Sequence, residues 1–371
     1  MANPYSAIKV FHHKDAIDRL RYESRIAAGD LEAHGGGVER PSAPIYIRLK
    51  PTNICNHHCV YCTYGSGDTK EKTENRDRIT HTDMIPWDKL QEIISDMGEM
   101  GVKAITLSGG GEPLTYPKVV EAIRLIKRYG IELSLITNGQ LLSEERAEEF
   151  YDAKWVRISF DSPNEADYMR LRGVSSSAFR QVIKNIGDFA KHKDKDCVLG
   201  INFVVGKANY LRVYEAAALL KSLGVSNVKF AAVVENTAHY HDDIKDTVIE
   251  QIHRAQSELE DESFAIFNNY ENDWQDKHLT TQPFSTCYVC KLVTVIAADQ
   301  KVYLCHTRAY DSSAVVGDLR DKTFKELWFS EEARRFLSSV NPKTDCKNFC
   351  AYQTRNELIQ AFFDTTHVNF I

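Results

Sequence analysis

The sequence predicts an α/β fold, in which a partial (β/α)6 TIM-like barrel is followed by a small cysteine-rich C-terminal domain. Short β-branched or aliphatic runs alternate with segments of helical periodicity. Strands that alternate with helices form parallel βαβ units, and six such units favour an open barrel over a flat doubly wound sheet. Five of the nine cysteines lie beyond residue 286, and they mark the second domain.

The first 43 residues are expected to form an N-terminal helical extension and a linker. "KDAIDRLRYESRIAAGD" has helical periodicity, and "AHGGGVERPSAP" is rich in Gly and Pro. The barrel is expected over residues 44–240, with strands at 45–50, 104–108, 132–138, 155–160, 199–205 and 228–234. Segments between them, such as "YPKVVEAIRLIKRYG", predict helices that end on Gly.

Residues 241–286 are expected to connect the two domains through a long charged helix, "DDIKDTVIEQIHRAQSELEDE". The second domain is expected over residues 287–371. Within it, "VTVIAADQKVYLC" has the alternation of a β-hairpin with Asp-Gln at its tip, and "TFKELWFSEEARRFLSSV" predicts a helix. The tail "ELIQAFFDTTHVNFI" predicts a docking helix.

The composition is typical of a cytoplasmic enzyme. The chain has 371 residues, 43% of them hydrophobic, so it can bury a sizeable core. No apolar run approaches the roughly 20 residues of a membrane-spanning helix, and the N-terminus lacks the apolar stretch of a signal peptide. The formal charge is −6, and acidic and basic residues are interspersed without a basic stripe, which disfavours a nucleic-acid partner.

Polar or Gly-rich stretches follow five of the six predicted strands: "PTNICNHHCVYC", "SGGGEPL", "TNG", "SFDSP" and "VENTAHYH". Loops at the carboxyl ends of barrel strands carry the functional residues of such folds. We therefore expect the active site at this edge of the barrel.

The first of these stretches contains Cys55, Cys59 and Cys62 at a C-x3-C-x2-C spacing. In a reducing compartment such a cluster indicates metal ligation instead of disulfides. Three thiolates on one short loop can hold one face of a cubane iron–sulfur cluster and leave one iron open for chemistry. The alternative is a structural zinc, with His57 or His58 as the fourth ligand.

With Tyr61 included, this motif resembles that of the radical S-adenosylmethionine (radical SAM) superfamily. The resemblance extends in order through the loops of residues 45 to about 235, and it implies a [4Fe–4S] cluster with three Cys ligands that binds S-adenosyl-L-methionine. The family motifs imply that the SAM-binding positions are Tyr61, Gly110, Gly111, Glu112, Asn138, Ser159 and Arg172.

The same resemblance implies the reaction. In this family an electron from the reduced cluster cleaves SAM, and the resulting 5′-deoxyadenosyl radical abstracts a hydrogen atom from a substrate. A reducing partner such as flavodoxin or ferredoxin is then expected.

The C-terminal cysteines resemble those of the SPASM/twitch extension. The resemblance implies that Cys287, Cys305, Cys346 and Cys350 hold one auxiliary [4Fe–4S] cluster, since five cysteines are too few for a second one. A four-cysteine zinc site is the alternative. Gln300 stands where the family usually has Gly, which is expected to change the hairpin turn but not the ligands.

Cys290 is left over from this set. It is expected to replace Cys287 as a ligand, to pack as an inert side chain, or to give a hydrogen atom to the substrate as a catalytic residue. Glu235, immediately beyond the sixth strand, is the second candidate catalytic residue, as a substrate contact or a proton carrier.

The resemblance implies an oxidoreductase that dehydrogenates a small polar metabolite such as a sugar or aminocyclitol. An alternative is the crosslinking or epimerisation of a ribosomally synthesised peptide. A non-catalytic zinc-binding scaffold or sensor is an alternative of another class.

Overall fold

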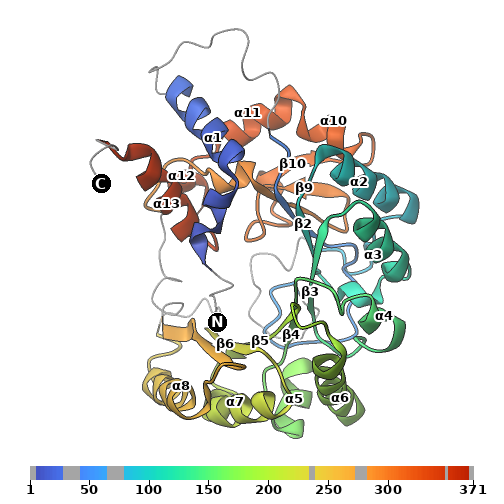
Figure 1. Ribbon diagram of the computed structural model, residues 1–371, viewed down its shortest axis with the longest axis vertical. Helices are drawn as coiled ribbons and strands as arrows, with labels where there is room; N and C mark the ends of the chain where they lie inside the picture. Colours follow the sequence, from blue (N-terminus) through green and yellow to red (C-terminus); the bar gives the residue numbers. More distant parts are fainter. Residues whose placement is uncertain are drawn as a thin grey trace.

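The computed structural model describes residues 6–27, 42–64, 79–233, 239–271, 282–346 and 350–366. One ten-stranded sheet organises the chain, in the order β10-β9-β8-β1-β2-β3-β4-β5-β6-β7 (Figure 1). The six predicted barrel strands are all present, and neighbouring strands pair in parallel. They are β1 (Tyr46–Leu49), β2 (Ala104–Leu107), β3 (Glu132–Thr137), β4 (Trp155–Ser159), β5 (Val198–Val205) and β6 (Asn227–Ala232). The predicted α/β barrel class is confirmed.

A seventh parallel strand extends the barrel beyond the prediction. β7 (Ala265–Asn268) pairs with β6 and follows α8 (Lys245–Leu259), the charged helix expected in the connecting region. Asp261 stabilises the turn before this strand, because its carboxylate accepts hydrogen bonds from the backbone N–H groups of Ser263 and Phe264. The region that was expected to be only helical therefore contributes to the barrel wall.

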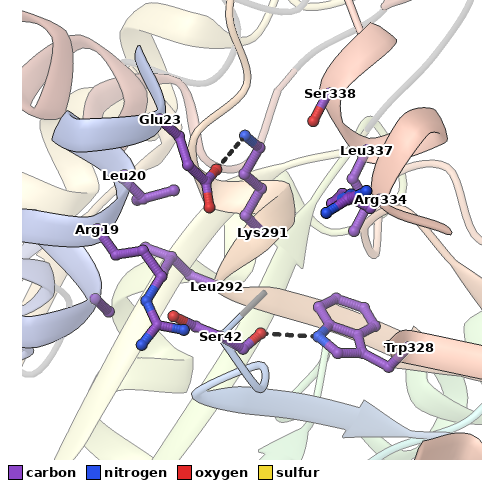
Figure 2. A pocket seen from close by; sticks show the side chains of 11 residues that line it. Arg19, Leu20, Glu23, Ser42, Lys291, Leu292, Trp328, Arg334, Leu337 and Ser338 are labelled. Atoms are coloured by element: carbon purple, nitrogen blue, oxygen red, sulfur yellow. Dashed lines mark hydrogen bonds and ion pairs between the residues drawn. The ribbon is translucent and has the colours of Figure 1, made fainter. Parts of the chain in front are cut away.

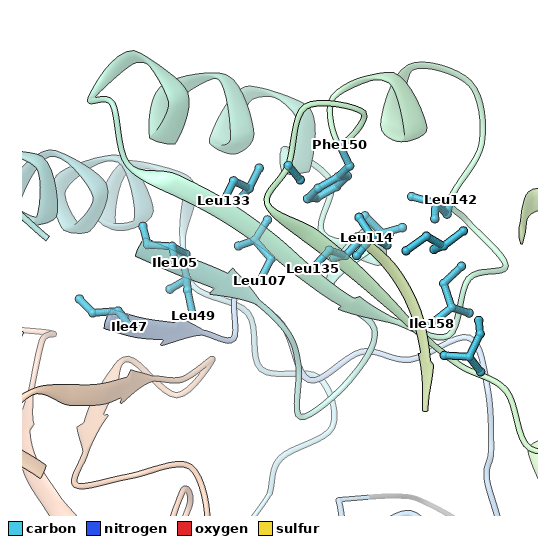
Figure 3. Close-up of a cluster of buried hydrophobic side chains, with 14 of the residues drawn as sticks. Ile47, Leu49, Ile105, Leu107, Leu114, Leu133, Leu135, Leu142, Phe150 and Ile158 are labelled. Carbon is cyan, nitrogen blue, oxygen red and sulfur yellow. The ribbon is translucent and has the colours of Figure 1, made fainter. Parts of the chain in front are cut away.

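Helices cover the outer face of the sheet (Figure 1). They are α2 (Trp87–Met100), α3 (Val119–Arg128), α4 (Glu144–Glu148), α5 (Glu165–Arg172), α6 (Ser176–His192) and α7 (Val213–Ser222). Alternate strand residues such as Ile47 and Leu49 are fully buried against these helices, as Figure 3 shows for part of the core. Because side chains alternate along a strand, Tyr46 and Arg48 point to the opposite face, the barrel lumen.

The C-terminal segment continues the same sheet. The predicted hairpin is present as β8 (Val293–Ile296) and β9 (Lys301–Tyr303), and β10 (Val315–Asp318) pairs with it in antiparallel fashion. β8 also pairs in parallel with β1, from Tyr46 opposite Val293 to Leu49 opposite Ile296. The barrel and the cysteine-rich segment are therefore joined by backbone hydrogen bonds as well as by the chain.

The helix expected after the hairpin is two helices, α10 (Phe324–Trp328) and α11 (Glu331–Ser339). The second begins at Ser330, whose hydroxyl accepts a hydrogen bond from Ala333 N at 3.1 Å and so caps a new helix. α12 (Pro342–Asp345) and α13 (Gln353–Asp364) follow, the latter being the predicted terminal helix.

The N-terminal helices pack on the C-terminal segment. η1 (Ala7–His12) and α1 (Lys14–Ala27) precede the barrel, and Ile17 and Leu20 share a core with Leu292 and Ile359. Figure 2 shows the small pocket beside this contact, where Lys291 pairs with Glu23 at 2.7 Å and the Trp328 indole donates to the Ser42 carbonyl at 2.9 Å. In the described part of the chain, no helix is long and apolar enough to cross a membrane.

Candidate active site

The loop that carries Cys55, Cys59 and Cys62 leaves the carboxyl end of β1, where the sequence places the site. On one side it binds the Gly-rich loop after β2. Gly111 N donates to the Thr52 carbonyl at 3.3 Å, and Glu112 N donates to the Ile54 carbonyl at 2.9 Å. As whole residues, Cys55 is exposed and Cys59 and Cys62 are half-buried.

Glycine at positions 110 and 111 is required by this contact. A Cβ atom on Gly111 would stand 2.1 Å from the Ile54 carbonyl oxygen, and one on Gly110 would stand 2.4 Å from Asn53 Oδ1. A side chain at position 111 would therefore push the backbone of the cysteine loop away, and one at position 110 would displace the Asn53 side chain. The predicted contact of these glycines with SAM stays a prediction, and the structure gives a second reason for the glycines.

On its other side, the cysteine loop binds the end of α5. His58 N donates to the Arg172 carbonyl at 2.9 Å, and Val60 N donates to the Leu171 carbonyl at 3.0 Å. Gly173 ends the helix in the left-handed region, with φ of 60°, and a Cβ atom there would meet the His58 carbonyl. The Gly-rich loop after β2 and the end of α5, which are far apart in sequence, thus hold the cysteine loop between them.

A buried ion pair lies beneath the cysteine loop. Asp161 is 0% exposed and Arg172 is 4% exposed, and their side chains form an ion pair. The Tyr61 hydroxyl donates to the same carboxylate, while Arg172 Nη1 donates to Cys59 Sγ at 3.6 Å. Burial is the largest single effect on the pKa of Arg172 and lowers it, but Asp161, Tyr61 and Cys59 together raise the pKa by more, so the guanidinium remains charged.

Glu112 organises the neighbouring loop after β3. Its carboxylate accepts hydrogen bonds from Thr137 Oγ1 at 2.7 Å, Asn138 N at 2.7 Å and Leu114 N at 3.1 Å. Burial raises the pKa of Glu112 to about 7, against the lowering effect of these hydrogen bonds. Glu112 and Asn138, both predicted to bind SAM, are therefore in direct contact.

His57 belongs to the wall of the site. Its Nε2 atom lies 2.8 Å from Gln140 Oε1, so this nitrogen carries the proton that it donates. Burial lowers the pKa of His57 to about 4, which makes the ring neutral. The Nε2 atom is thus engaged by an amide oxygen, whereas Nδ1 is buried without a hydrogen-bond partner among the described residues, so this geometry leaves the zinc alternative with His57 open.

Lys50 is a functional candidate that the sequence reasoning missed. It directly follows β1, is 1% exposed, and donates to the Tyr64 hydroxyl at 3.0 Å. Its ammonium group also lies 4.1 Å from the centre of the Tyr64 ring and 5.0 Å from that of Tyr310. The sequence signal was available, because a lysine that closes an apolar strand at the active edge is uncommon.

Asp161 was also missed as an individual residue. It stands in the quoted "SFDSP" loop, two residues after the predicted ligand Ser159, which ends β4. Glu235, the predicted substrate contact, lies outside the described residues, so its role stays a prediction.

The four C-terminal cysteines predicted as ligands lie close enough to interact electrostatically, and their role as ligands stays a prediction. The electrostatic neighbours of Cys305 include Cys287, Cys346 and Cys350, and burial raises the pKa of Cys305 and of Cys350 to about 12. No three His, Cys, Asp or Glu side chains in the described chain surround a single-ion position. The fit to a cluster rests on the donor type and on the proximity of the thiols, because a cubane spreads its ligands over four irons.

Cys290 lies beside one of these four, Cys287, but is more deeply buried. It is 1% exposed and packs in the main hydrophobic core, and its thiol donates to the Cys287 carbonyl at 3.0 Å and lies 3.8 Å from the Leu337 carbonyl. This placement is unfavourable for the predicted catalytic role of Cys290, because a thiol buried among core side chains has no open path to substrate, and that role stays a prediction. The structure favours the packing alternative.

Gln300 occupies the tip of the β8–β9 hairpin with φ of 62°, the left-handed region that favours glycine. The backbone N–H of Gln300 donates to the Ala297 carbonyl at 2.9 Å, and the backbone carbonyl of Gln300 accepts from Leu319 N at 2.8 Å. The expected change in the turn is therefore absent, since Gln300 adopts the conformation that a glycine would provide.

A cavity of about 380 Å³ opens into the lower barrel, at the amino-terminal ends of the strands. Barrel residues that line it include Tyr46, Arg48 and Arg157. His306 and Tyr352 line its other side, and they are close neighbours in sequence of Cys305 and Cys350. The C-terminal cysteine segment therefore borders the barrel lumen.

Several buried polar atoms of the site have no hydrogen-bond partner among the described residues. They include Ser108 Oγ after β2 and Arg172 Nε beside the cysteine loop. Buried polar atoms are nearly always paired in folded proteins, so such atoms indicate a place for a polar ligand. The residues present therefore fit an iron–sulfur cluster and SAM at the carboxyl edge of the barrel.

Comparison with known proteins gives two family matches. The model of the radical SAM superfamily matches residues 49–248, and that of the SPASM iron–sulfur cluster-binding domain matches residues 287–351. The first covers more than half of the 371-residue chain.

Two curated relatives illustrate the range of the similarity. The PqqA peptide cyclase of Gluconobacter oxydans is 28% identical over 193 residues, which are 52% of this chain and 50% of the cyclase. The AdoMet-dependent heme synthase of Methanosarcina barkeri is 29% identical over 336 residues, which are 85% of this chain and 91% of the synthase. The match to the cyclase thus spans only half of that protein.

A solved structure supports the fold. The structure of anSMEcpe with bound AdoMet and a Kp18Cys peptide has a TM-score of 0.57 and 16% identity, and the match covers 86% of this chain and 97% of that one. The family matches and this shared fold agree with the geometry of the cysteine loop and of its two supporting loops. The chain belongs to the radical SAM superfamily and carries a C-terminal SPASM domain.

Proposed function

We propose that this radical SAM enzyme oxidises a small polar substrate by two electrons inside the barrel lumen. The family implies a [4Fe–4S] cluster, SAM and auxiliary iron–sulfur chemistry. What we propose beyond this is the ligand set, the location of the substrate and the outcome of the reaction.

The proposed ligands are Cys55, Cys59 and Cys62 for the SAM-binding cluster, and Cys287, Cys305, Cys346 and Cys350 for one auxiliary cluster. When bound, these groups supply a 5′-deoxyadenosyl radical that removes a hydrogen atom from the substrate, and an acceptor for the second electron. A reducing partner such as flavodoxin or ferredoxin is part of the proposal.

The protein contributes orientation and exclusion of water. The Asp161–Arg172 pair holds the cysteine loop through Cys59 and Tyr61, and Glu112 fixes the backbone of Asn138 beside it. Arg172 and Ser159 stay the proposed contacts to SAM, and Glu235 the proposed proton carrier.

One observation carries the proposal of substrate oxidation. The cavity in the lumen is lined both by inward-facing barrel residues and by His306 and Tyr352, which flank Cys305 and Cys350. A substrate in this cavity would lie beside the auxiliary ligands, so that its second electron has a short path to an acceptor. Dehydrogenation needs such an acceptor.

The cluster inventory tests the first part of the proposal. Anaerobically purified wild-type protein is expected to contain about eight irons per chain, and a Cys55/Cys59/Cys62→Ala triple variant about four, if both clusters are cubanes. With SAM and dithionite, the wild type is expected to form 5′-deoxyadenosine and the triple variant none. Wild-type protein that contains zinc instead of iron, or that leaves SAM intact, would contradict the proposal.

A second candidate is modification of a ribosomally synthesised peptide. It is supported by the similarity to the PqqA peptide cyclase. The product distinguishes the candidates. Dehydrogenation consumes SAM and gives a small-molecule product two hydrogens lighter, crosslinking gives a peptide lighter by the same mass, and epimerisation in D₂O places deuterium on a peptide carbon without oxidation.

A further inference from the structure

The lower barrel lumen is strongly cationic. Among the described residues that line its cavity of about 380 Å³, five carry a positive charge and one is a carboxylate. The cations are Lys9, Arg48, Lys154, Arg157 and Arg355, and the carboxylate is Glu132. Glu132 lies at the exposed rim, where Lys154 is 3.4 Å from it, so it does not balance the charges deeper in the cavity.

Arg48 lines this cavity from β1. It is on the inward face of β1, and its Nε atom is buried without a hydrogen-bond partner among the described residues. Burial is the largest single effect on its pKa and lowers it, but Tyr46 and Tyr352 with their neighbours raise the pKa by more in total, so the guanidinium stays charged. A buried charged group with an unpaired hydrogen-bond donor is costly, and an anion bound to it would remove this cost.

His306 faces the same space from the C-terminal segment. Its Nδ1 atom is also buried and has no partner in the described part of the chain. Arg355 comes from a third element, α13, and its guanidinium lies 5.7 Å from the centre of the Tyr352 ring. Donors from β1, the loop after β9 and α13 therefore line one cavity.

We propose that the lower lumen is a subsite for an oxyanion of the substrate, a carboxylate or a phosphate, held by Arg48 and Arg355 with His306 beside them. Guanidinium groups bind such planar or tetrahedral oxyanions through paired N–H donors. This inference rests on the proposed function and narrows its substrate to an anionic molecule.

The position of this subsite also sets a minimum length for the substrate. Arg48 lies two residues before Lys50 along β1, which corresponds to about 7 Å at the usual rise of a strand. The reacting carbon belongs near the carboxyl edge, beside the cysteine loop. The anionic group is therefore expected at least that far from the C–H bond that reacts.

Calorimetric titration of the anaerobic holoenzyme tests the subsite. Sodium phosphate and sodium succinate are the probes, and neutral succinamide is the control ligand. We expect saturable binding of one equivalent of at least one anion and none of succinamide. The anion that binds identifies the substrate group as a phosphate or a carboxylate.

Variants locate the binding. Arg48→Gln and Arg355→Gln are each expected to weaken anion binding by at least about tenfold, a typical loss for one charge-assisted contact. Arg48→Lys should recover part of it. Arg254→Gln is the matched control, because Arg254 is an exposed arginine of α8 that pairs with Glu258. Iron content and circular dichroism establish that each variant is folded, and Arg355→Gln keeps the test valid if Arg48→Gln does not fold.

Anion binding that is absent in the wild type, or equal in wild type, Arg48→Gln and Arg355→Gln, would overturn the proposal. The same preparations are assayed for 5′-deoxyadenosine with SAM and dithionite. Normal SAM cleavage without anion binding refutes the subsite alone, whereas anion binding without SAM cleavage refutes the proposed reaction alone.

Discussion

Asp161 is the residue on which the support of the cysteine loop depends most directly. It accepts from Tyr61, pairs with Arg172 and accepts from the backbone N–H of Val204 on β5 at 2.7 Å. One carboxylate thus joins the cysteine loop, the end of α5 and the barrel wall. Its removal leaves a buried guanidinium without its counter-charge.

We predict that Asp161→Asn destabilises the protein by about 3–5 kcal/mol, the usual effect of breaking a buried ion pair from one side. Denaturant unfolding under anaerobic conditions measures this. Asp243→Asn is the control, because Asp243 pairs with Lys207 at the surface and should matter little. Equal effects of the two substitutions would contradict the role given to Asp161.

The raised pKa of Glu112 predicts that the stability of the protein depends on pH. Its folded pKa of about 7 lies above its ordinary value of 4.5, because burial disfavours the carboxylate. The folded state therefore binds more protons than the unfolded state between these values, and stability from this group falls as pH rises from about 4.5 to about 7.

Glu112→Gln should remove this fall. Without SAM, the free energy of unfolding of the variant minus that of wild type is expected to rise by up to about 3 kcal/mol between pH 5 and pH 8. Denaturant titrations at several pH values measure it. Glu262→Gln, at an exposed position, is the control and should leave the profile unchanged. A constant difference between Glu112→Gln and wild type would contradict the prediction.

At the scale of elements, the β8–β9 hairpin contains a residue under conformational strain. A non-glycine residue in the left-handed region is less stable there by about 1 kcal/mol. Gln300→Gly should therefore raise the stability of the protein by up to that amount. Because glycine also has more conformational freedom in the unfolded chain, this gain is partly or fully offset, and the smallest expected effect is no change.

Thermal unfolding of the holoenzyme checks this prediction. Glu250→Gly, in the exposed interior of α8, is the matched control and is expected to lower stability by about 1 kcal/mol. If Gln300→Gly destabilises the protein as much as Glu250→Gly does, the turn is not strained at Gln300.

At the scale of the whole molecule, the pairing of β1 with β8 makes the barrel and the SPASM segment one structural unit. Ile47 and Leu49 of the barrel share a hydrophobic core with Ile296, Val302 and residues of α10. Without β8, strand β1 would expose its backbone N–H and C=O groups as a sheet edge, which favours aggregation.

A chain truncated after residue 286 is therefore expected to be insoluble or aggregated, as measured by sedimentation and gel filtration. Truncation after residue 366 keeps every described element and is the control. A soluble, monomeric 1–286 fragment with native circular dichroism would show that the barrel folds independently.

Local sequence patterns predicted the elements well. Each barrel strand lies within a residue or two of its expected position, because alternation and flanking turns are local signals. β7 was missed because a four-residue strand after a charged helix has too short a pattern. The break between α10 and α11 was missed because both halves are amphipathic, and only the cap at Ser330 separates them.

The sequence by itself determined the cysteine loop, the order of the motifs and the family to which they belong, because these are properties of spacing along the chain. Tertiary structure alone decided that Asp161 meets Arg172 and Tyr61, that Cys290 is buried, and that Arg48 and His306 face one cavity. These residues are up to 258 positions apart (306 − 48), and their contacts depend on how strands pair and which face turns inward. A one-dimensional pattern shows that side chains alternate, but not which side becomes the lumen.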